Sequence, residues 1–384
     1  MTASALTRPG ERERLIVKLG QIDWTFCAVL TAITLAGGAM LWSIAGGSWT
    51  PWAAKHLILF AVCLAAMIAL AMVDPRVWFA LAYPVYGAGL VLLAAVAVVG
   101  HASLGAKRWL DIGPIRLQPS EIIKIGLVLA IARFYHSLPP GRARLSWWLL
   151  IPAAMTAIPA AAVAHQPDLG TALLIAATGG IMMILAGLSL RLVGAGLVGV
   201  VAILPPVFMF ALKGYQRARL LTFLDPEADR SGAGYHIIQS KIALGSGGLL
   251  GKGFGLGTQS QLNFLPEKST DFIFSSLAEE FGFVGCASIL LLYAAAIFMS
   301  LRMASLSHSH FGRLAAAGVT TTFALCVLIN GAMVMGLAPV VGVPMPLLSF
   351  GGTVMITMMV GFGLVLAVRV HRYSEVTSGR GALI

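Results

Sequence analysis

Apolar runs of about 20 residues recur along almost the whole chain, and they constrain the fold more than any other feature. A helix of 20 residues is about 30 Å long, so each run can cross the hydrocarbon core of a bilayer. Hydrophobic residues make up 58% of the chain and charged residues 11%, far from the balance of a soluble domain. The sequence predicts an all-α, polytopic membrane protein with about ten transmembrane helices, at 24–45, 52–73, 77–99, 118–135, 147–164, 171–188, 190–211, 272–300, 314–336 and 346–369.

The orientation of these spans follows from lysine and arginine, which remain preferentially on the cytoplasmic side in short connections. With both ends inside, fourteen of these residues are cytoplasmic: Arg8, Arg12, Arg14, Lys18, Arg76, Arg133, Arg142, Arg144, Arg191, Arg302, Arg313, Arg369, Arg372 and Arg380. The short outer loops carry four, at Lys55, Lys107, Arg108 and Arg116. We therefore expect a multi-pass membrane protein with cytoplasmic termini, and the first run lacks the small-residue cleavage site of a removable signal peptide.

The net charge of +11 does not indicate a nucleic-acid-binding protein, because no basic run with interleaved aromatic residues stands apart from the spans. Membrane topology explains about half of the charge. The cations on the outer side suit an anionic ligand, although a solvated polar loop would explain them equally well. The four cysteines lie within apolar runs without metal-ligand spacing, so we interpret them as core or lipid-facing residues.

One long outer segment, about 212–271, interrupts the pattern between the seventh and eighth spans. It carries polar motifs and a glycine-rich stretch from Gly245 to Gly257, together with enough apolar residues to rest on the membrane domain. The glycines do not form a phosphate-binding loop, because Ser246 and Gly253 occupy the positions that need glycine and Ser or Thr. We expect a compact extracytoplasmic loop packed against helices, within one membrane domain that spans 1–384.

Ionisable residues near the ends of spans are costly in a membrane and often indicate a polar cavity. Glu121 and Lys124 lie three residues apart on one helix face, where they can pair. A glutamate at a helix start and a snorkelling lysine would be the structural alternative. Asp168 and Asp271 precede spans, and helix capping alone could explain each. Asp271 shares a face with Ser275 and Glu279, and the topology places all these acidic groups toward one outer vestibule.

Five motifs together resemble the SEDS family of cell-wall proteins (shape, elongation, division and sporulation) over nearly the whole chain. They are Arg108–Gly113 with Gln118–Lys124, Gln166–Thr171, Gly234–Lys241, Leu265–Phe274 and Pro339–Gly352. The residues at 234–236, 278–280 and 341–344 look like the elongation member more than the division member. The chain departs from the usual pattern at Lys268, Ser269 and Phe350, none of which removes a carboxylate.

The resemblance implies a peptidoglycan glycosyltransferase that polymerises lipid II into β-1,4-linked strands and releases undecaprenyl diphosphate. It also implies a partner, a class B penicillin-binding protein with transpeptidase activity, and other elongation-complex membrane proteins. Asp271 matches the essential aspartate of the family, and we expect it to be the catalytic base. Candidate substrate-binding residues are Arg108, Trp109, Gln118, Ser120, Glu121, Lys124, Asp168, Arg217, Arg219, His236, Gln239, Lys241, Glu267 and Thr270.

Three questions remain open from the sequence. A divalent cation, Mg²⁺ or Mn²⁺, could bridge the diphosphate to Glu121, Asp168 or Asp271, or no cofactor could be needed. A lipid II flippase would need alternating access and related halves, and the sequence shows no convincing internal repeat. A scaffold that only activates a transpeptidase would leave the charged vestibule without a role.

Overall fold

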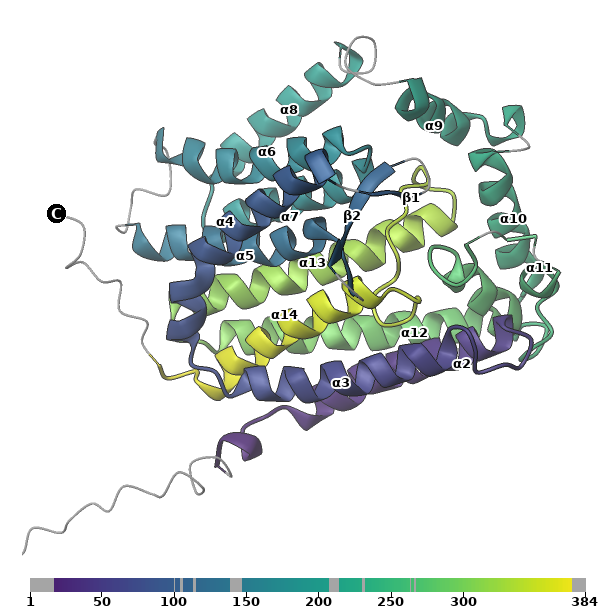
Figure 1. Cartoon of the computed structure of the whole chain (residues 1–384), viewed down its shortest axis with the longest axis horizontal. Helices are drawn as coiled ribbons and strands as arrows, with labels where there is room; N and C mark the ends of the chain where they lie inside the picture. Colours follow the sequence, from purple (N-terminus) through teal and green to yellow (C-terminus); the bar gives the residue numbers. More distant parts are fainter. Residues whose placement is uncertain are drawn as a thin grey trace, which may run out of the picture.

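The computed structural model describes residues 17–99, 101–103, 106–112, 115–138, 147–206, 214–229, 232–262, 264–265 and 267–374. Six cations predicted to be cytoplasmic lie outside these ranges: Arg8, Arg12, Arg14, Arg142, Arg144 and Arg380. Each of the ten predicted spans contains a helix within the described residues. The chain forms a helical bundle with its long axis along most of these helices (Figure 1).

Within the described ranges, seven helices are long and apolar enough to cross a membrane: α2 (Trp24–Ile44), α3 (Ala53–Ala71), α4 (Pro75–Val99), α6 (Leu150–His165, preceded by the 3₁₀ turn Trp147–Leu149), α12 (Ile273–Ser305), α13 (His310–Val334) and α14 (Gly352–Val370). The other three predicted spans correspond to α5 (Pro119–Ser137), α7 (Leu169–Leu185) and α8 (Leu190–Pro206). Helix α5 carries three charged residues, and α7 and α8 have 17 residues each, which sets them apart by composition or length.

Helices α13 and α14 form the centre of the bundle. In their apolar stretches, 67% and 78% of the residues are buried, compared with 22% in α6 and α12. Helix α13 packs against α5, α7, α12 and α14, and α14 also packs against α3. The outer helices therefore present most of their apolar side chains outward, as expected of helices that face lipid.

The predicted start of the last span was wrong. We expected helix from residue 346, but α14 begins at Gly352, and residues 338–351 form an irregular segment. Pro344 and Pro346 cannot donate backbone hydrogen bonds, and Gly342 and Leu347 have φ of 65° and 66°. Side chains from distant helices form hydrogen bonds with two backbone carbonyls of this segment. The Tyr293 hydroxyl donates to the Pro346 oxygen at 2.5 Å, and His56 Nε2 lies 3.1 Å from the Leu347 oxygen.

The predicted outer connection between the third and fourth spans contains a small antiparallel sheet. The order is β1 (His101–Ser103), β2 (Ala106–Ile112) and β3 (Ile115–Leu117). The sheet joins α4 to α5. It adds a β element to an otherwise helical fold.

The long segment between α8 and α12 is largely helical. It contains α9 (Gly214–Leu224), the 3₁₀ turn Pro226–Ala228, α10 (Ala233–Ser246) and α11 (Thr258–Gln261). Figure 1 shows α10 and α11 at one end of the bundle, beside the turn that joins α2 to α3. Helix α10 packs on α12 and α13. The segment is therefore a structured cap on that end.

The glycine-rich stretch packs its backbone directly against a kink in α12, as the packing interpretation predicted. Gly282 within α12 has φ 62° and ψ −158°, outside the helical region. Four backbone hydrogen bonds of 2.9–3.1 Å join the two segments: Lys252 to Glu279, Gly253 to Glu280, Phe283 to Gly248 and Val284 to Leu249. A Cβ atom on Gly251 would lie 2.1 Å from the Glu280 carbonyl oxygen, which explains the glycine.

Candidate active site

A cavity of about 630 Å³ is lined in part by Arg219 of α9 and His236 of α10. Its walls come from the sheet, the first turns of α5 and α7, the turn that precedes α12, and the segment between α13 and α14. The lining residues are Trp109, Gln118, Glu121, Lys124, Asp168, Thr171, Leu174, Arg219, His236, Glu267, Thr270, Asp271, Cys326, Val340, Val341, Gly342, Val343, Pro344, Phe350, Gly351, Thr353 and Val354. Segments more than 200 residues apart thus meet at one place.

Most of the predicted site residues line this cavity: Trp109, Gln118, Glu121, Lys124, Asp168, Arg219, His236, Glu267, Thr270 and Asp271. Four others do not line it: Ser120, Arg217, Gln239 and Lys241. Lys241 is exposed on α10 and its side chain lies against Gly336 at the end of α13. The side chain of Arg108 lies outside the described residues. Of the described cations among the predicted substrate-binding residues, Lys124 and Arg219 line the cavity.

Glu121 and Lys124 form an ion pair in the wall of the cavity. Pro119 begins α5, and the two side chains lie one turn further along, with Lys124 Nζ 2.7 Å from Glu121 Oε1. Their side chains are 4% and 5% exposed, so this is not a lysine that snorkels to water. Glu121 Oε2 is buried without a hydrogen-bond partner among the described residues, so the pair keeps a free acceptor.

Asp168 both caps α7 and lines the cavity. Its Oδ1 accepts a hydrogen bond from the backbone N–H of Thr171 at 3.2 Å, and the residue is 4% exposed. The capping account from the sequence is therefore correct, and it holds a second carboxylate close to the wall that contains Lys124.

Asp271 belongs to a tight turn rather than to a helix cap. The N-cap residue of α12 is Phe272, so Asp271 does not occupy the N-cap position that the capping account would give it. The backbone N–H groups of Thr270, Asp271 and Phe272 all donate to the Glu267 carbonyl at 3.1–3.3 Å. Glu267 itself adopts φ 53°, in the left-handed region. The turn presents Glu267, Thr270 and Asp271 to the cavity together.

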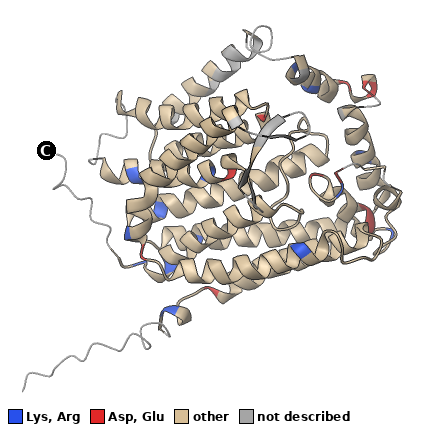
Figure 2. Ribbon diagram, in the orientation of Figure 1, with Lys and Arg blue, Asp and Glu red and all other residues tan. Residues whose placement is uncertain are grey.

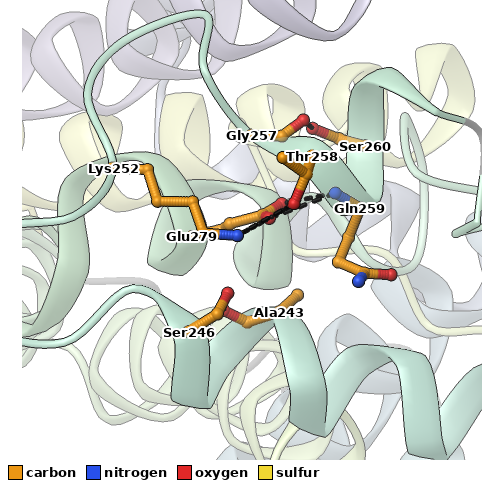
Figure 3. A network of polar contacts seen from close by, with 8 residues as sticks. All are labelled: Ala243, Ser246, Lys252, Gly257, Thr258, Gln259, Ser260 and Glu279. Carbon is orange, nitrogen blue, oxygen red and sulfur yellow. Dashed lines mark hydrogen bonds and ion pairs between the residues drawn. The ribbon is translucent and has the colours of Figure 1, made fainter.

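Ser275 and Glu279, which share a helix face with Asp271 by spacing, do not line the cavity. Ser275 Oγ is bonded to Ser240 Oγ at 2.8 Å, across to α10. Glu279 is fully buried and accepts from Lys252 Nζ at 2.6 Å, from the Thr258 hydroxyl at 2.9 Å and from the backbone of Gln259 at 3.1 Å. Figure 3 shows these donors converging on Glu279. This carboxylate therefore fastens α11 to α12.

His236 stands next to the turn that carries Asp271. Its ring is stacked on Phe272, with the ring centroids 6.0 Å apart and the planes at 22°. Burial lowers the pKa of His236, and the nearby Glu267 and Asp229 carboxylates oppose that shift. The imidazole is therefore predominantly neutral at pH 7, when it can both donate and accept a hydrogen bond.

Lys268 supports the same turn from the other side. Its Nζ donates to the Ser260 carbonyl of α11 at 2.7 Å, and burial lowers its pKa. Among the described residues, no group of three or more His, Cys, Asp or Glu side chains is arranged to hold a metal ion.

The sequence interpretation assigned no role at the site to Cys326 or to Asn330. Cys326, taken for a core or lipid-facing residue, is 1% exposed and lies in the cavity wall. Asn330, on α13, donates from Nδ2 to the Asp271 carbonyl at 2.9 Å. In the sequence, Asn330 is an amide within an apolar run. Because a buried amide without hydrogen-bond partners is costly, its presence there could have indicated polar partners inside the bundle.

The fold and the cavity together define a polytopic membrane protein with a charged site at one end of its bundle. The family model described as "cell cycle protein", FtsW/RodA/SpoVE, matches residues 22–374, and the chain belongs to this family. This confirms the resemblance to SEDS proteins found in the sequence.

Individual relatives agree with the family. The chain is 44% identical over 353 residues to the peptidoglycan glycosyltransferase MrdB of Escherichia coli K12, covering 91% of this chain and 94% of that protein. It is 37% identical over 295 residues to MrdB of Helicobacter pylori, covering 75% of each.

Solved structures share the fold. A chain from the structure described as "Structural coordination of polymerization and crosslinking by a peptidoglycan synthase complex" has a TM-score of 0.80 at 32% identity, covering 92% of this chain and 99% of that one. The rod shape determining protein RodA of Thermus thermophilus has a TM-score of 0.69 at 30% identity, covering 92% and 98%. The chain is thus similar to the elongation members of the family, as its motifs predicted.

Proposed function

We propose that the cavity is the active site of a peptidoglycan glycosyltransferase that polymerises lipid II during cell elongation. The relatives are named peptidoglycan glycosyltransferases, and the similarity to them extends over nearly the whole chain. The single observation that carries the proposal is the turn Glu267–Asp271, which presents a partly exposed carboxylate to a large cavity that also contains a buried cation.

Asp271 acts as the general base in this proposal. It removes the proton from the 4-hydroxyl of the acceptor N-acetylglucosamine as that oxygen forms a bond to the anomeric carbon of the donor chain. The bond from the anomeric carbon to the diphosphate breaks, with inversion to a β-1,4 link. Undecaprenyl diphosphate leaves with the electron pair.

Lys124 and Arg219 stabilise the charge that develops on this diphosphate. Cations that are held in place before the reaction stabilise a developing charge without reorganisation. Lys124 is held by Glu121, and Arg219 reaches the cavity from α9. Asp168, His236 and the amide of Gln118 line the same space and are candidates to bind sugar hydroxyls.

The proposal places this site on the extracytoplasmic side of a bacterial plasma membrane, with both termini in the cytoplasm. Residues 1–384 form a single SEDS-type domain in which 212–271 is the outer segment. The partner is a class B penicillin-binding protein, which would cross-link the strands, together with other membrane proteins of the elongation complex. The structural neighbour from a peptidoglycan synthase complex supports this assignment.

Polymerisation of purified lipid II by the purified protein and its transpeptidase partner tests the proposal. Asp271→Asn keeps the shape of the side chain and cannot accept the proton, so we expect no glycan strands from this variant and long strands from wild type. Wild-type rates from Asp271→Asn would remove the proposed base. A lack of polymer from both proteins, together with movement of lipid II across vesicles, would favour the flippase alternative.

A further inference from the structure

Asn330 of α13 is hydrogen-bonded to two segments that contribute residues to the cavity wall. The residue is fully buried on α13, and its Nδ2 donates to the Asp271 carbonyl at 2.9 Å and to the Val343 carbonyl at 2.8 Å. These oxygens belong to segments that are 72 positions apart in the sequence, the turn before α12 and the irregular segment before α14. One amide group therefore holds both segments to the central helix.

One of the two carbonyls belongs to Asp271, the residue that we assign as the base, and the other belongs to the residue that follows Gly342. Asp271 is the last residue of its turn, and a Cβ atom on Gly342 would lie 3.5 Å from Asp271 Oδ2. Gly342 directly precedes Val343 and has φ 65°, so its backbone passes close to the carboxylate. Asn330 therefore hydrogen-bonds to both segments near the point where the Asp271 side chain approaches the backbone of Gly342.

The chemistry of the two partners requires an amide at position 330. Both are carbonyl oxygens, so the group between them must donate two hydrogen bonds, which fixes the NH₂ of Asn330 toward them. An ionised aspartate has no donor, a threonine has one, and a leucine has none. Asn330 Oδ1 is buried without a hydrogen-bond partner among the described residues, which costs free energy of desolvation. The two hydrogen bonds donated by Nδ2 offset that cost.

We propose that Asn330 is a positioning residue that sets the direction and distance of Asp271 relative to the facing segment 338–351. This inference rests on the proposed function, in which Asp271 is the base. Asn330 does not line the cavity, so it acts through Asp271 and does not bind lipid II. Its loss should therefore lower the rate of the chemical step without changing the affinity for substrate.

The test measures kcat and KM for lipid II polymerisation with Asn330→Leu, which has a similar volume and no donors. We expect kcat to fall at least tenfold while KM stays within twofold of wild type. Asn330→Asp should lose kcat in the same way, and it keeps the test available if the leucine variant does not fold. Asn330→Gln retains both donors on a longer side chain and should recover part of the loss.

Thr320→Val is the matched control on the same helix. Thr320 is 1% exposed and its hydroxyl donates to the Ala316 carbonyl of α13 at 2.8 Å, away from the cavity. This variant removes one buried side-chain hydrogen bond within α13 and should keep the wild-type kcat. An equal loss of kcat in Thr320→Val, or a raised KM with unchanged kcat in Asn330→Leu, would overturn the positioning role.

Asp271→Asn separates the two levels of the inference. If Asp271→Asn makes no polymer while a folded Asn330→Leu polymerises at the wild-type rate, the positioning role is wrong and the base assignment stands. If Asp271→Asn itself is active, the proposed function fails first.

Discussion

At the scale of single residues, the carboxylates of this protein are held in different ways according to their surroundings. Glu279 is fully buried and receives several donors, whereas Asp271 is partly exposed on a turn. Glu121 lies between these cases, with one oxygen paired to Lys124 and the other without a partner among the described residues. The acceptors of Glu279 are filled by structural donors, whereas Glu121 keeps an acceptor that a ligand can use.

The Glu121–Lys124 pair can be separated into its structural and its binding contributions. Lys124→Met leaves Glu121 as a buried charge without its cation, and removing one partner of such a pair costs about 3–5 kcal/mol. We expect a clear fall in melting temperature and a several-fold rise in KM for lipid II. The double variant Glu121→Gln with Lys124→Met removes the uncompensated charge, so it should regain most of the stability.

The double variant decides the role of the lysine. If Lys124 binds the diphosphate, KM stays raised in the double variant even though its stability returns. A double variant that uses lipid II as wild type does would assign Lys124 to structure alone.

At the scale of elements, the glycine-rich stretch and the kink in α12 form one unit. Gly251 has φ 80° and Gly282 has φ 62°, and each lies where a Cβ atom would meet backbone of the other segment. Glu279 and Glu280 precede the kink, and both are fully buried; Glu280 accepts from the Ser43 hydroxyl at 2.5 Å and from the Gly255 backbone at 3.1 Å. The unit therefore connects α2, α11 and α12.

Gly251→Ala tests this unit against Gly245→Ala in α10. The Gly251 change forces φ 80° on alanine and brings its Cβ within 2.1 Å of a carbonyl oxygen. We expect a loss of about 2 kcal/mol or more in the free energy of unfolding. Gly245 has nothing within 4 Å of a new Cβ and lies in a helix, so Gly245→Ala should be neutral or slightly stabilising.

Thermal unfolding in detergent with both variants measures the difference. Polymerisation should fall in Gly251→Ala together with stability, because the same unit holds α11 and, through Lys268, the turn that carries Asp271. Equal melting temperatures for the two variants would contradict the close packing of the glycine backbone.

At the scale of the whole molecule, the first and last described spans meet at the same end of the bundle. Arg369, near the end of α14, forms an ion pair with Asp23 at the start of α2 and donates from Nε to the Gln21 carbonyl at 3.2 Å. Figure 2 shows several of the blue segments on the spanning helices at this end, opposite α10 and α11. The start of α2 and the end of α14 therefore lie on one side of the bundle, as the proposed topology requires.

Labelling of single cysteines tests that orientation. Trp49 lies between α2 and α3 and is 59% exposed, and Tyr373 follows α14 and is 72% exposed. A membrane-impermeant maleimide added to intact spheroplasts should label Trp49→Cys at once and Tyr373→Cys after permeabilisation alone. Wild type serves as the control, since Cys27, Cys63 and Cys326 are buried and Cys286 is half-buried. The reverse labelling pattern would invert the topology and move the cavity to the cytoplasm.

The sequence by itself determined the spans, the family and most of the polar residues of the cavity. Span positions follow from hydropathy, which is a local property of the chain and does not depend on how helices pack. The motifs around Glu121, Asp168 and Asp271 lie at span ends, where an unpaired charge is costly and often indicates a functional site. They could therefore be identified without a structure.

Tertiary structure alone decided which of these residues meet. Arg217, Gln239 and Lys241 have the same polar character as Arg219, and the rotation of α9 and α10 about their axes directs them away from the cavity. Helix α10 packs on α12 and α13, and α9 packs on α10 and on the 3₁₀ turn Pro226–Ala228, so contacts between separate elements set that rotation. The same holds for Asn330, because a pair of carbonyl partners contributed by two distant segments leaves no local pattern in the chain.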